Sequence, residues 1–373
     1  MSFKEFGYPK AMPEVLSLLV TNRCCCRCLH CFNWKDVNPK GAIGDESKKD
    51  LTLDEIERTF SGIGHLGYIY IGGGEPFMRE DIGDILKILS TVCRPVTINL
   101  STNGQFPDKV TSVVSGFLEE GTRTELVVKV SLDGVGEDHD RIRQRVNAYA
   151  KAMETYRALG ELKKSCPGLT VGLNTVYSAL NEKRIPAFYE HVSSLDPRPD
   201  CLAQLLVRDI PRGGEAMKAV DLEAYQAWTD RYDRDMWEGR FEHDRKVKIA
   251  TILMHRYLHR ALKTGMPVIH CMAGIAGAFI DNEGNVGACE HQVPYGNLRA
   301  AGYDFKKIWF SGVAQEARQK TYQSCHCTNE PQWWHPSIRY NPPVVREGYV
   351  LLMWYLLHTW IRKIRRAMIA KKR

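Results

Sequence analysis

Six apolar segments rich in β-branched residues alternate with segments of helical periodicity. The apolar segments are the predicted strands: Val15–Thr21, Gly67–Gly72, Val96–Ser101, Leu126–Leu132, Leu169–Tyr177 and Cys201–Val207. Between them, apolar residues three and four positions apart predict helices at Leu53–Ile63, Asp81–Thr91, Lys109–Glu119, Glu137–Leu159 and Asn181–Ser193. Because the return to a parallel neighbour requires a crossover, this order predicts an α/β fold on a parallel sheet, either open and doubly wound or closed towards a barrel.

Four motifs with ligand-binding chemistry follow the first four predicted strands. A cysteine-rich loop follows the first strand, and the motifs GGGEP, STNG and SLDG begin at Gly72, Ser101 and Ser131. In open parallel sheets and in barrels alike, ligands bind at the carboxyl ends of the strands. The four motifs are therefore expected to form one site.

The cysteine-rich loop carries Cys24, Cys28 and Cys31 at a C-x3-C-x2-C spacing. Three thiolates can hold three irons of a four-iron, four-sulfur (4Fe-4S) cluster, and the fourth iron is then open to a small molecule. A zinc site or a set of reduced structural thiols is the alternative. Cys25 and Cys26 lie in the same loop and have no assigned role.

These motifs, in this order, resemble those of the radical S-adenosylmethionine superfamily, and the resemblance extends to about residue 330. It implies a partial (β/α)6 TIM-like barrel and a 4Fe-4S cluster on Cys24, Cys28 and Cys31. It also implies reductive cleavage of S-adenosylmethionine to a 5′-deoxyadenosyl radical, with a flavodoxin or ferredoxin as electron donor. The residues expected to bind the cofactor are Gly73, Gly74, Glu75, Ser101, Asn103, Ser131, Asp133, Arg143 and Asn174. No catalytic acid or base is assigned.

A second cysteine region follows two further predicted helices, Asp221–Trp237 and Arg245–Thr264. Cys271 and Cys289 flank a predicted hairpin, Gly277–Ile280 with Asn285–Ala288, in a C-x12-G-x4-C pattern. The pattern resembles the SPASM or twitch extension, and it implies one auxiliary 4Fe-4S cluster on Cys271, Cys289, Cys325 and Cys327. A zinc site on the same four cysteines is the alternative.

Four domains are expected: a partial barrel over residues 1–215, a helical connection over 216–265, an auxiliary cluster domain over 266–345 and a basic amphipathic tail helix over 346–373. Twelve cysteines without an N-terminal secretory pattern predict a reducing, cytoplasmic location. The tail holds eight Lys or Arg and one Glu, so it accounts for the whole net charge of +7. Because the remainder is neutral, no nucleic-acid partner is expected.

The tail also bears on the substrate. Its apolar run Tyr349–Leu357 is nine residues long, whereas a membrane-spanning helix needs about 20. A basic helix with aromatic residues is suited to bind the anionic inner face of the membrane. The alternative is that this helix packs on the rest of the protein. A membrane location predicts a lipid, isoprenoid or lipid-linked substrate.

The sequence is compatible with two alternative functions. One is a peptide maturase of the SPASM type, which the 23 residues before Cys24 disfavour because they leave no room for a preceding peptide-recognition domain. The other is a non-catalytic iron–sulfur electron-transfer protein or a zinc structural protein, for which the GGGEP, STNG and SLDG motifs would have no use.

Overall fold

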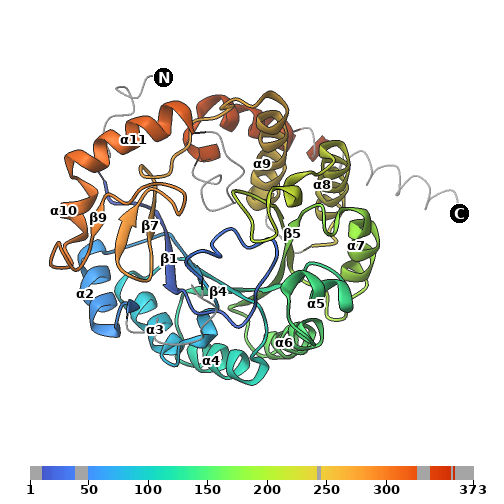
Figure 1. The fold of residues 1–373 in the computed structure, drawn as a ribbon, viewed down its shortest axis with the longest axis horizontal. Coiled ribbons are helices and arrows are strands. Elements are labelled where there is room, and N and C mark those ends of the chain that lie inside the picture. Colours follow the sequence, from blue (N-terminus) through green and yellow to red (C-terminus); the bar gives the residue numbers. More distant parts are fainter. Residues whose placement is uncertain (1–10, 38–48, 242–244, 326–336, 354–355, 358–373) are drawn as a thin grey trace, which may run out of the picture.

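The computed structural model describes residues 11–37, 49–241, 245–325, 337–353 and 356–357. Six parallel strands form its main sheet: β1 (Val15–Thr21), β2 (Tyr68–Gly73), β3 (Thr97–Thr102), β4 (Glu125–Ser131), β5 (Leu169–Tyr177) and β6 (Cys201–Leu206). Each strand pairs with the next along the chain, and the sheet curves into a partial barrel (Figure 1). The predicted α/β fold and its six strands are confirmed.

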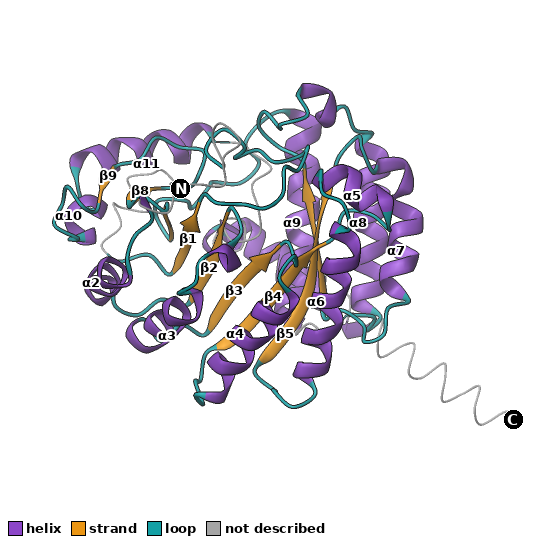
Figure 2. Cartoon of the chain, turned by 60° about the horizontal axis from the view of Figure 1, so that its bottom comes forward, coloured by secondary structure: helices purple, strands orange, loops and turns teal. Residues whose placement is uncertain are grey.

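Helices cover the outer side of the curved sheet (Figure 2). They are α2 (Leu53–Ile63), α3 (Ile82–Val92), α4 (Pro107–Glu119), α5 (Glu137–Arg143), α6 (Ala148–Lys163) and α7 (Ile185–Ser193). The short 3-10 turns η3 (Pro76–Met78), η4 (Glu182–Arg184) and η5 (Glu215–Lys218) lie in the connections that follow strands. Alternate strand residues such as Ile69, Ile98 and Val128 are buried beneath these helices, because successive side chains of a strand point to opposite faces. The other set faces the barrel interior.

The helix predicted over Glu137–Leu159 is two helices, α5 and α6. The break lies at Gln144 and Asn147, whose φ angles are 53° and 59°. The carboxylate of Asp140 accepts hydrogen bonds from the backbone N–H of Asn147 (2.8 Å) and Tyr149 (2.7 Å), so it caps the start of α6. The break was not predicted, because this polar turn contains no Gly or Pro and hardly interrupts the helical spacing of apolar residues.

The predicted hairpin continues the main sheet. Strand β7 (Gly277–Ile280) pairs in parallel with β1 and antiparallel with β8 (Asn285–Gly287), and β9 (Gly296–Asn297) completes a nine-stranded order β6-β5-β4-β3-β2-β1-β7-β8-β9. Helices α10 (Phe305–Trp309) and α11 (Gly312–Ser324) follow it, while α8 (Leu222–Trp237) and α9 (Arg245–Thr264) connect β6 to this extension. The extension is thus attached to the barrel through backbone hydrogen bonds.

The C-terminal segment is described in part. Residues 342–353 are helical and pack on α9, where the hydroxyl of Tyr257 donates to Glu347 (2.9 Å). Residues 358–373, the end of the predicted tail helix, lie outside the described residues. Among the helices that the structure describes, none has the length and apolarity to cross a membrane.

Candidate functional site

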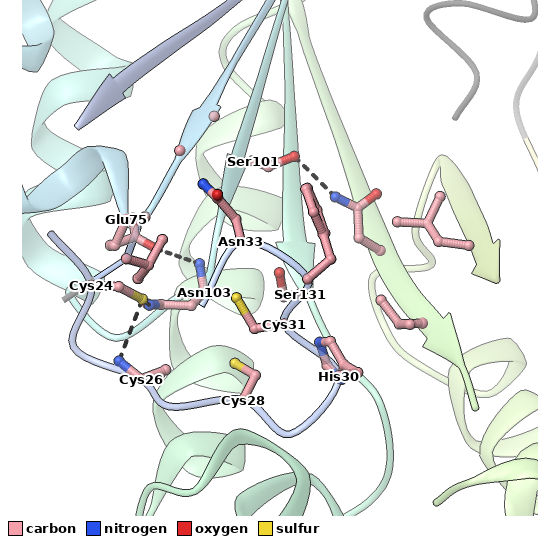
Figure 3. Close-up of a pocket in the computed structure, with 18 of the residues that line it drawn as sticks. Cys24, Cys26, Cys28, His30, Cys31, Asn33, Glu75, Ser101, Asn103 and Ser131 are labelled. Atoms are coloured by element: carbon pink, nitrogen blue, oxygen red, sulfur yellow. Dashed lines mark hydrogen bonds between the residues drawn. The ribbon is translucent and has the colours of Figure 1, made fainter. Parts of the chain in front are cut away.

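A cavity of about 220 Å³ lies at the carboxyl ends of the barrel strands. Most of the residues predicted to bind a cofactor line it: Cys24, Cys28, Cys31, Gly73, Gly74, Glu75, Ser101, Asn103, Ser131, Arg143 and Asn174. In Figure 3 the sulfur atoms of Cys24, Cys28 and Cys31 point towards a common space between the loop and the strand ends. The four sequence motifs therefore meet in one place.

Two glycines of the GGGEP motif allow close contact between β2 and the start of the cysteine loop. Gly73 has a φ of +123°, and a side chain there would overlap the carbonyl oxygen of Thr21. A side chain at Gly74 would overlap the carbonyl oxygen of Arg23. The backbone N–H groups of Gly74 and Glu75 donate to Thr21 and Arg23, at 2.7 Å each. The motif thereby fixes the backbone directly before Cys24.

Glu75 is buried at the cavity wall and joins two strand ends. Its carboxylate accepts hydrogen bonds from the Thr102 hydroxyl (2.8 Å) and from the backbone N–H groups of Asn103 (2.6 Å) and Phe77 (3.1 Å). Burial raises the pKa of Glu75 to about 7, while the hydrogen bond from Asn103 lowers it. The predicted contact of Glu75 with a ligand ammonium stays a prediction, and the observed role is to hold β2 and β3 together.

The cysteine loop is also held by α5. The backbone N–H groups of Arg27 and Leu29 donate to the carbonyl oxygens of Arg143 (3.1 Å) and Ile142 (2.9 Å). The guanidinium of Arg143 lies 3.6 Å from the sulfur of Cys28. The pKa of Cys28 is lowered to about 5, first by a hydrogen bond from the Cys26 thiol and then, against burial, by Arg143. This environment stabilises a thiolate, which is the form that ligates iron.

Asp133 differs from the other predicted cofactor residues, since it is fully buried behind Arg143 and does not line the cavity. Its carboxylate accepts from Arg143 Nε (2.6 Å) and from the backbone N–H of Val176 (2.9 Å), and it lies 4.0 Å from His30 Nε2. Asp133 therefore orients Arg143, and through it the loop that carries Cys28. Arg143 is itself committed to this ion pair, so its predicted contact with a cofactor carboxylate stays a prediction.

Cys25 and Cys26 have different surroundings. The sulfur of Cys25 accepts from Asn103 Nδ2 (3.4 Å), and Cys25 does not line the cavity. Cys26 does line it, and its backbone N–H donates to the sulfur of Cys24 (3.4 Å). The single thiol proton of Cys26 lies among neighbouring sulfurs, and hydrogen bonding to them, to Cys24 first, raises the pKa of Cys26 together with burial. These contacts place Cys26 as a thiol donor among its neighbours.

A hydrogen-bonded group on β2, β3 and β5 forms the floor of the cavity. Tyr70 Oη and Asn174 Nδ2 donate to the hydroxyl oxygen of Ser101, at 3.1 and 3.0 Å. A hydroxyl has two lone pairs and one proton, so Ser101 keeps its own proton for an acceptor in the cavity. Sequence reasoning missed Tyr70, although its place two residues before Gly72 on the inward-facing side of β2 was a usable signal.

The wall opposite the glycine motif combines apolar and charged side chains. Val176, Leu205 and Val207 line it together with Arg208, whose guanidinium stacks on the ring of Phe32 at 4.2 Å and pairs with Glu290. Glu290 was not predicted, because it lies in the extension and reaches the cavity only through the fold. This wall presents one cation, one anion and an apolar surface.

The second cysteine region is described for three of its four cysteines. Cys289 is buried, Cys271 and Cys325 are half-buried, and Cys327 lies outside the described residues. Cys289 and Cys271 both lie near Tyr295, whose pKa is raised by burial and further by these two thiols. None of the described cysteines forms a disulfide.

The donor set at the cavity fits the cofactors that the motifs imply. Three cysteines converge beside an arginine, and hydroxyl, amide and guanidinium groups surround the space. Gly73 and Gly74, which we call the glycine cradle, leave no room for a side chain. Where the structure describes side chains, no three His, Cys, Asp or Glu are arranged to hold a single metal ion. In an iron–sulfur cluster each thiolate binds a different iron, so a single-ion arrangement is not required. Cys24, Cys28 and Cys31 would hold the cluster.

Comparison with known proteins agrees with this site. Residues 18–190 match the Radical SAM superfamily. The Fe-coproporphyrin III synthase of Methanosarcina barkeri is 28% identical over 184 residues, which cover 49% of this chain and 42% of that protein. The PqqA peptide cyclase of Bradyrhizobium diazoefficiens is 28% identical over 200 residues, covering 51% of this chain and 45% of that protein. The matched part thus spans less than half the length of either relative.

Among solved structures, Streptococcus suis SuiB bound to S-adenosylmethionine superposes with a TM-score of 0.58 over 83% of this chain and 68% of SuiB. At 15% identity this likeness shows the fold alone. The family implies a 4Fe-4S cluster and S-adenosylmethionine, and the cavity contains the cysteines and the polar groups for both. The motifs gather at one barrel edge, and they lie within residues 18–190, the part of the chain that matches the Radical SAM superfamily of enzymes.

Proposed function

We propose that this protein cleaves S-adenosylmethionine and uses the resulting radical to modify a peptide. The observation that carries the first part is the convergence of Cys24, Cys28 and Cys31 with the Gly73–Gly74 cradle in one cavity. When bound, the cluster supplies the electron that breaks a carbon–sulfur bond of S-adenosylmethionine. The chain's own residues hold the loop, orient the cofactor and exclude water.

Each group in the cavity has a distinct part in this proposal. Asp133 and Arg143 keep the Cys28 loop in position, and Glu75 ties the glycine motif to β3. Ser101, held by Tyr70 and Asn174, donates its remaining proton to an acceptor atom of the cofactor. Phe32, under the guanidinium of Arg208, closes the cavity on the side of the cysteine loop.

A peptide is preferred to the lipid that the tail alone predicts. Two relatives carry names that refer to peptides, the PqqA peptide cyclase and a SuiB structure described as bound to its precursor peptide SuiA. The wall formed by Arg208 and Glu290 also offers a donor and an acceptor side by side, which match the C=O and N–H groups of a peptide backbone. A purely hydrocarbon chain has no polar group that could bind to this pair.

The cofactor assignment is tested by anaerobic purification, iron and sulfide counts, and a chromatographic assay for 5′-deoxyadenosine after dithionite reduction with S-adenosylmethionine. The wild type is expected to form 5′-deoxyadenosine, and Cys28→Ala is expected to form none. Cys166→Ala is the control, because Cys166 is half-buried between α6 and β5 and away from the cavity. Zinc in place of iron, without cleavage, would reject the proposal.

The substrate class is tested separately with an extract of source cells, divided into an aqueous peptide fraction and a chloroform-extractable fraction. Formation of 5′-deoxyadenosine is expected to rise with the peptide fraction, and the rise is expected to disappear after proteinase K treatment. A rise that follows the chloroform fraction and survives the protease would establish the lipid alternative.

A further inference from the structure

The helix over residues 342–353 has one face buried against α9. Val344 and Leu351 are buried on this face. At Gly348 a side chain would come within 3.1 Å of Leu253 on α9, so the two helices are in close contact there. The acidic residue of this segment, Glu347, accepts from Tyr257 and pairs with Arg256 (3.4 Å) and Arg260 (3.6 Å). Its negative charge is thereby directed towards α9.

The opposite face of the same segment carries large apolar side chains in solvent. Tyr349, Val350, Met353 and Leu357 are 53 to 68% exposed. Within the helix, Tyr349, Val350 and Met353 lie at positions i, i+1 and i+4, which share one side, and Leu357 follows in the described helical residues 356–357. Arg346 is also exposed and lies one turn before Val350 on this side. We call Arg346, Tyr349, Val350, Met353 and Leu357 the outer face.

The positive charge around the outer face indicates which kind of partner it would bind. Residues 346–373 contain eight Lys or Arg and a single acidic residue, which is the one paired with α9. Exposed Arg256 and Arg260 on α9 add positive charge beside the segment. An apolar stripe accompanied by basic residues binds at the boundary of an anionic bilayer, where the apolar groups enter the acyl region and the cations meet lipid headgroups.

We infer that the outer face docks this protein on an anionic phospholipid surface. The inference goes beyond the proposed function, because neither the cavity nor the cleavage of S-adenosylmethionine requires a membrane. Each Lys or Arg held near such a surface adds to the attraction, so binding weakens steeply as the salt concentration rises.

The test is co-sedimentation of the full chain with vesicles of phosphatidylcholine, with and without about 30% phosphatidylglycerol. The protein is expected to sediment with the anionic vesicles, to be released by about 0.5 M salt, and to remain in solution with the neutral vesicles. The variant Val350→Asp is expected to bind about tenfold more weakly, because a carboxylate would have to enter the apolar boundary.

The matched control is Val96→Asp. Val96 is 66% exposed at the start of the barrel sheet, Val350 is 64% exposed, and both variants change the net charge equally. Val96→Asp is expected to bind like the wild type, and thermal unfolding checks that both variants are folded. Equal loss in both variants, or no binding by the wild type, would overturn the inference. A dimer in solution that Val350→Asp dissociates, without vesicle binding, would show that a second copy covers the outer face.

Discussion

At the scale of single residues, Gly74 is the position where even one added methyl group is expected to disturb the cysteine loop most. A methyl group at Gly74 would overlap the carbonyl of Arg23, so Gly74→Ala must displace the backbone that precedes Cys24. We expect reconstituted Gly74→Ala to retain about half the wild-type iron or less, because close-packed backbone leaves no room for relaxation. Iron and sulfide analysis under anaerobic conditions measures this.

Gly116→Ala is the control for this substitution. Gly116 lies in α4 with nothing within 4 Å of the added carbon, and Ala is the better helix former by about 1 kcal/mol. It should keep its full iron content and unfold at a slightly higher denaturant concentration. Full iron in Gly74→Ala would show that the cradle does not position the cysteine loop.

The ion pair behind the cavity gives a second residue-scale prediction. Asp133→Asn leaves the buried guanidinium of Arg143 without its counter-charge, which costs about 3–5 kcal/mol in comparable buried pairs. Urea unfolding of the anaerobic protein measures the change. Asp138→Asn, which removes a partly exposed partner of Arg141 and Arg184, should cost about 1 kcal/mol or less. Equal losses would show that Asp133 is not specially required.

At the scale of elements, the strands and most helices of the barrel were predicted to within two residues. Strand β5 and helix α2 have the predicted bounds. Period-two and period-3.6 patterns identify elements whose one face is buried, and every barrel element has such a face. The parallel pairing of β7 with β1 was not predicted, because pairing between strands about 260 residues apart leaves no local pattern in either strand.

The contact between α2 and the extension gives an element-scale prediction. Arg299 donates to both carboxylate oxygens of Glu55, at 2.7 and 2.9 Å. This ion pair, with a hydrogen bond from Tyr303, lowers the pKa of Glu55 to about 2, from 4.5 in an unfolded chain. A lowered carboxyl pKa stabilises the fold fully above pH 4.5, and this contribution is lost as the pH falls towards 2.

We therefore expect Glu55→Gln to be less stable than the wild type by about 1–2 kcal/mol at pH 6. This value is smaller than the full pKa shift implies, because solvent around the half-exposed Arg299 screens the ion pair. Near pH 2 the two proteins should be almost equally stable. Denaturant unfolding at both pH values measures the difference. Glu57→Gln changes an exposed carboxyl on the same helix and should leave stability unchanged. The same deficit at both pH values would mean that packing, and not the ion pair, is responsible.

At the scale of the whole molecule, the sequence located one wall of the cavity better than the other. Cys24, Glu75, Ser101 and Asn174 follow recognisable motifs or lie at strand ends, so strand order alone brings them together. Glu290 and the stacking of Arg208 on Phe32 depend on how the extension folds back over the barrel, and no local pattern reports that contact. These unpredicted contacts lie on the wall that is proposed to meet the substrate.

The two cysteine regions are expected to act as independent sites. If Cys271, Cys289, Cys325 and Cys327 hold one auxiliary 4Fe-4S cluster, Cys289→Ala should lower the iron content from about eight to about four per chain. Cleavage of S-adenosylmethionine should persist, because the cavity cysteines lie on the loop after β1 and are held by β2 and α5.

Cys93→Ala is the matched control, since it removes an equally buried thiol between α3 and β3 and should keep all the iron. About four irons and one zinc in the wild type would assign the second region to zinc, because both metals accept the same thiolates. Loss of all iron in Cys289→Ala would instead show that the extension, joined to β1 through β7, is needed to form the first site.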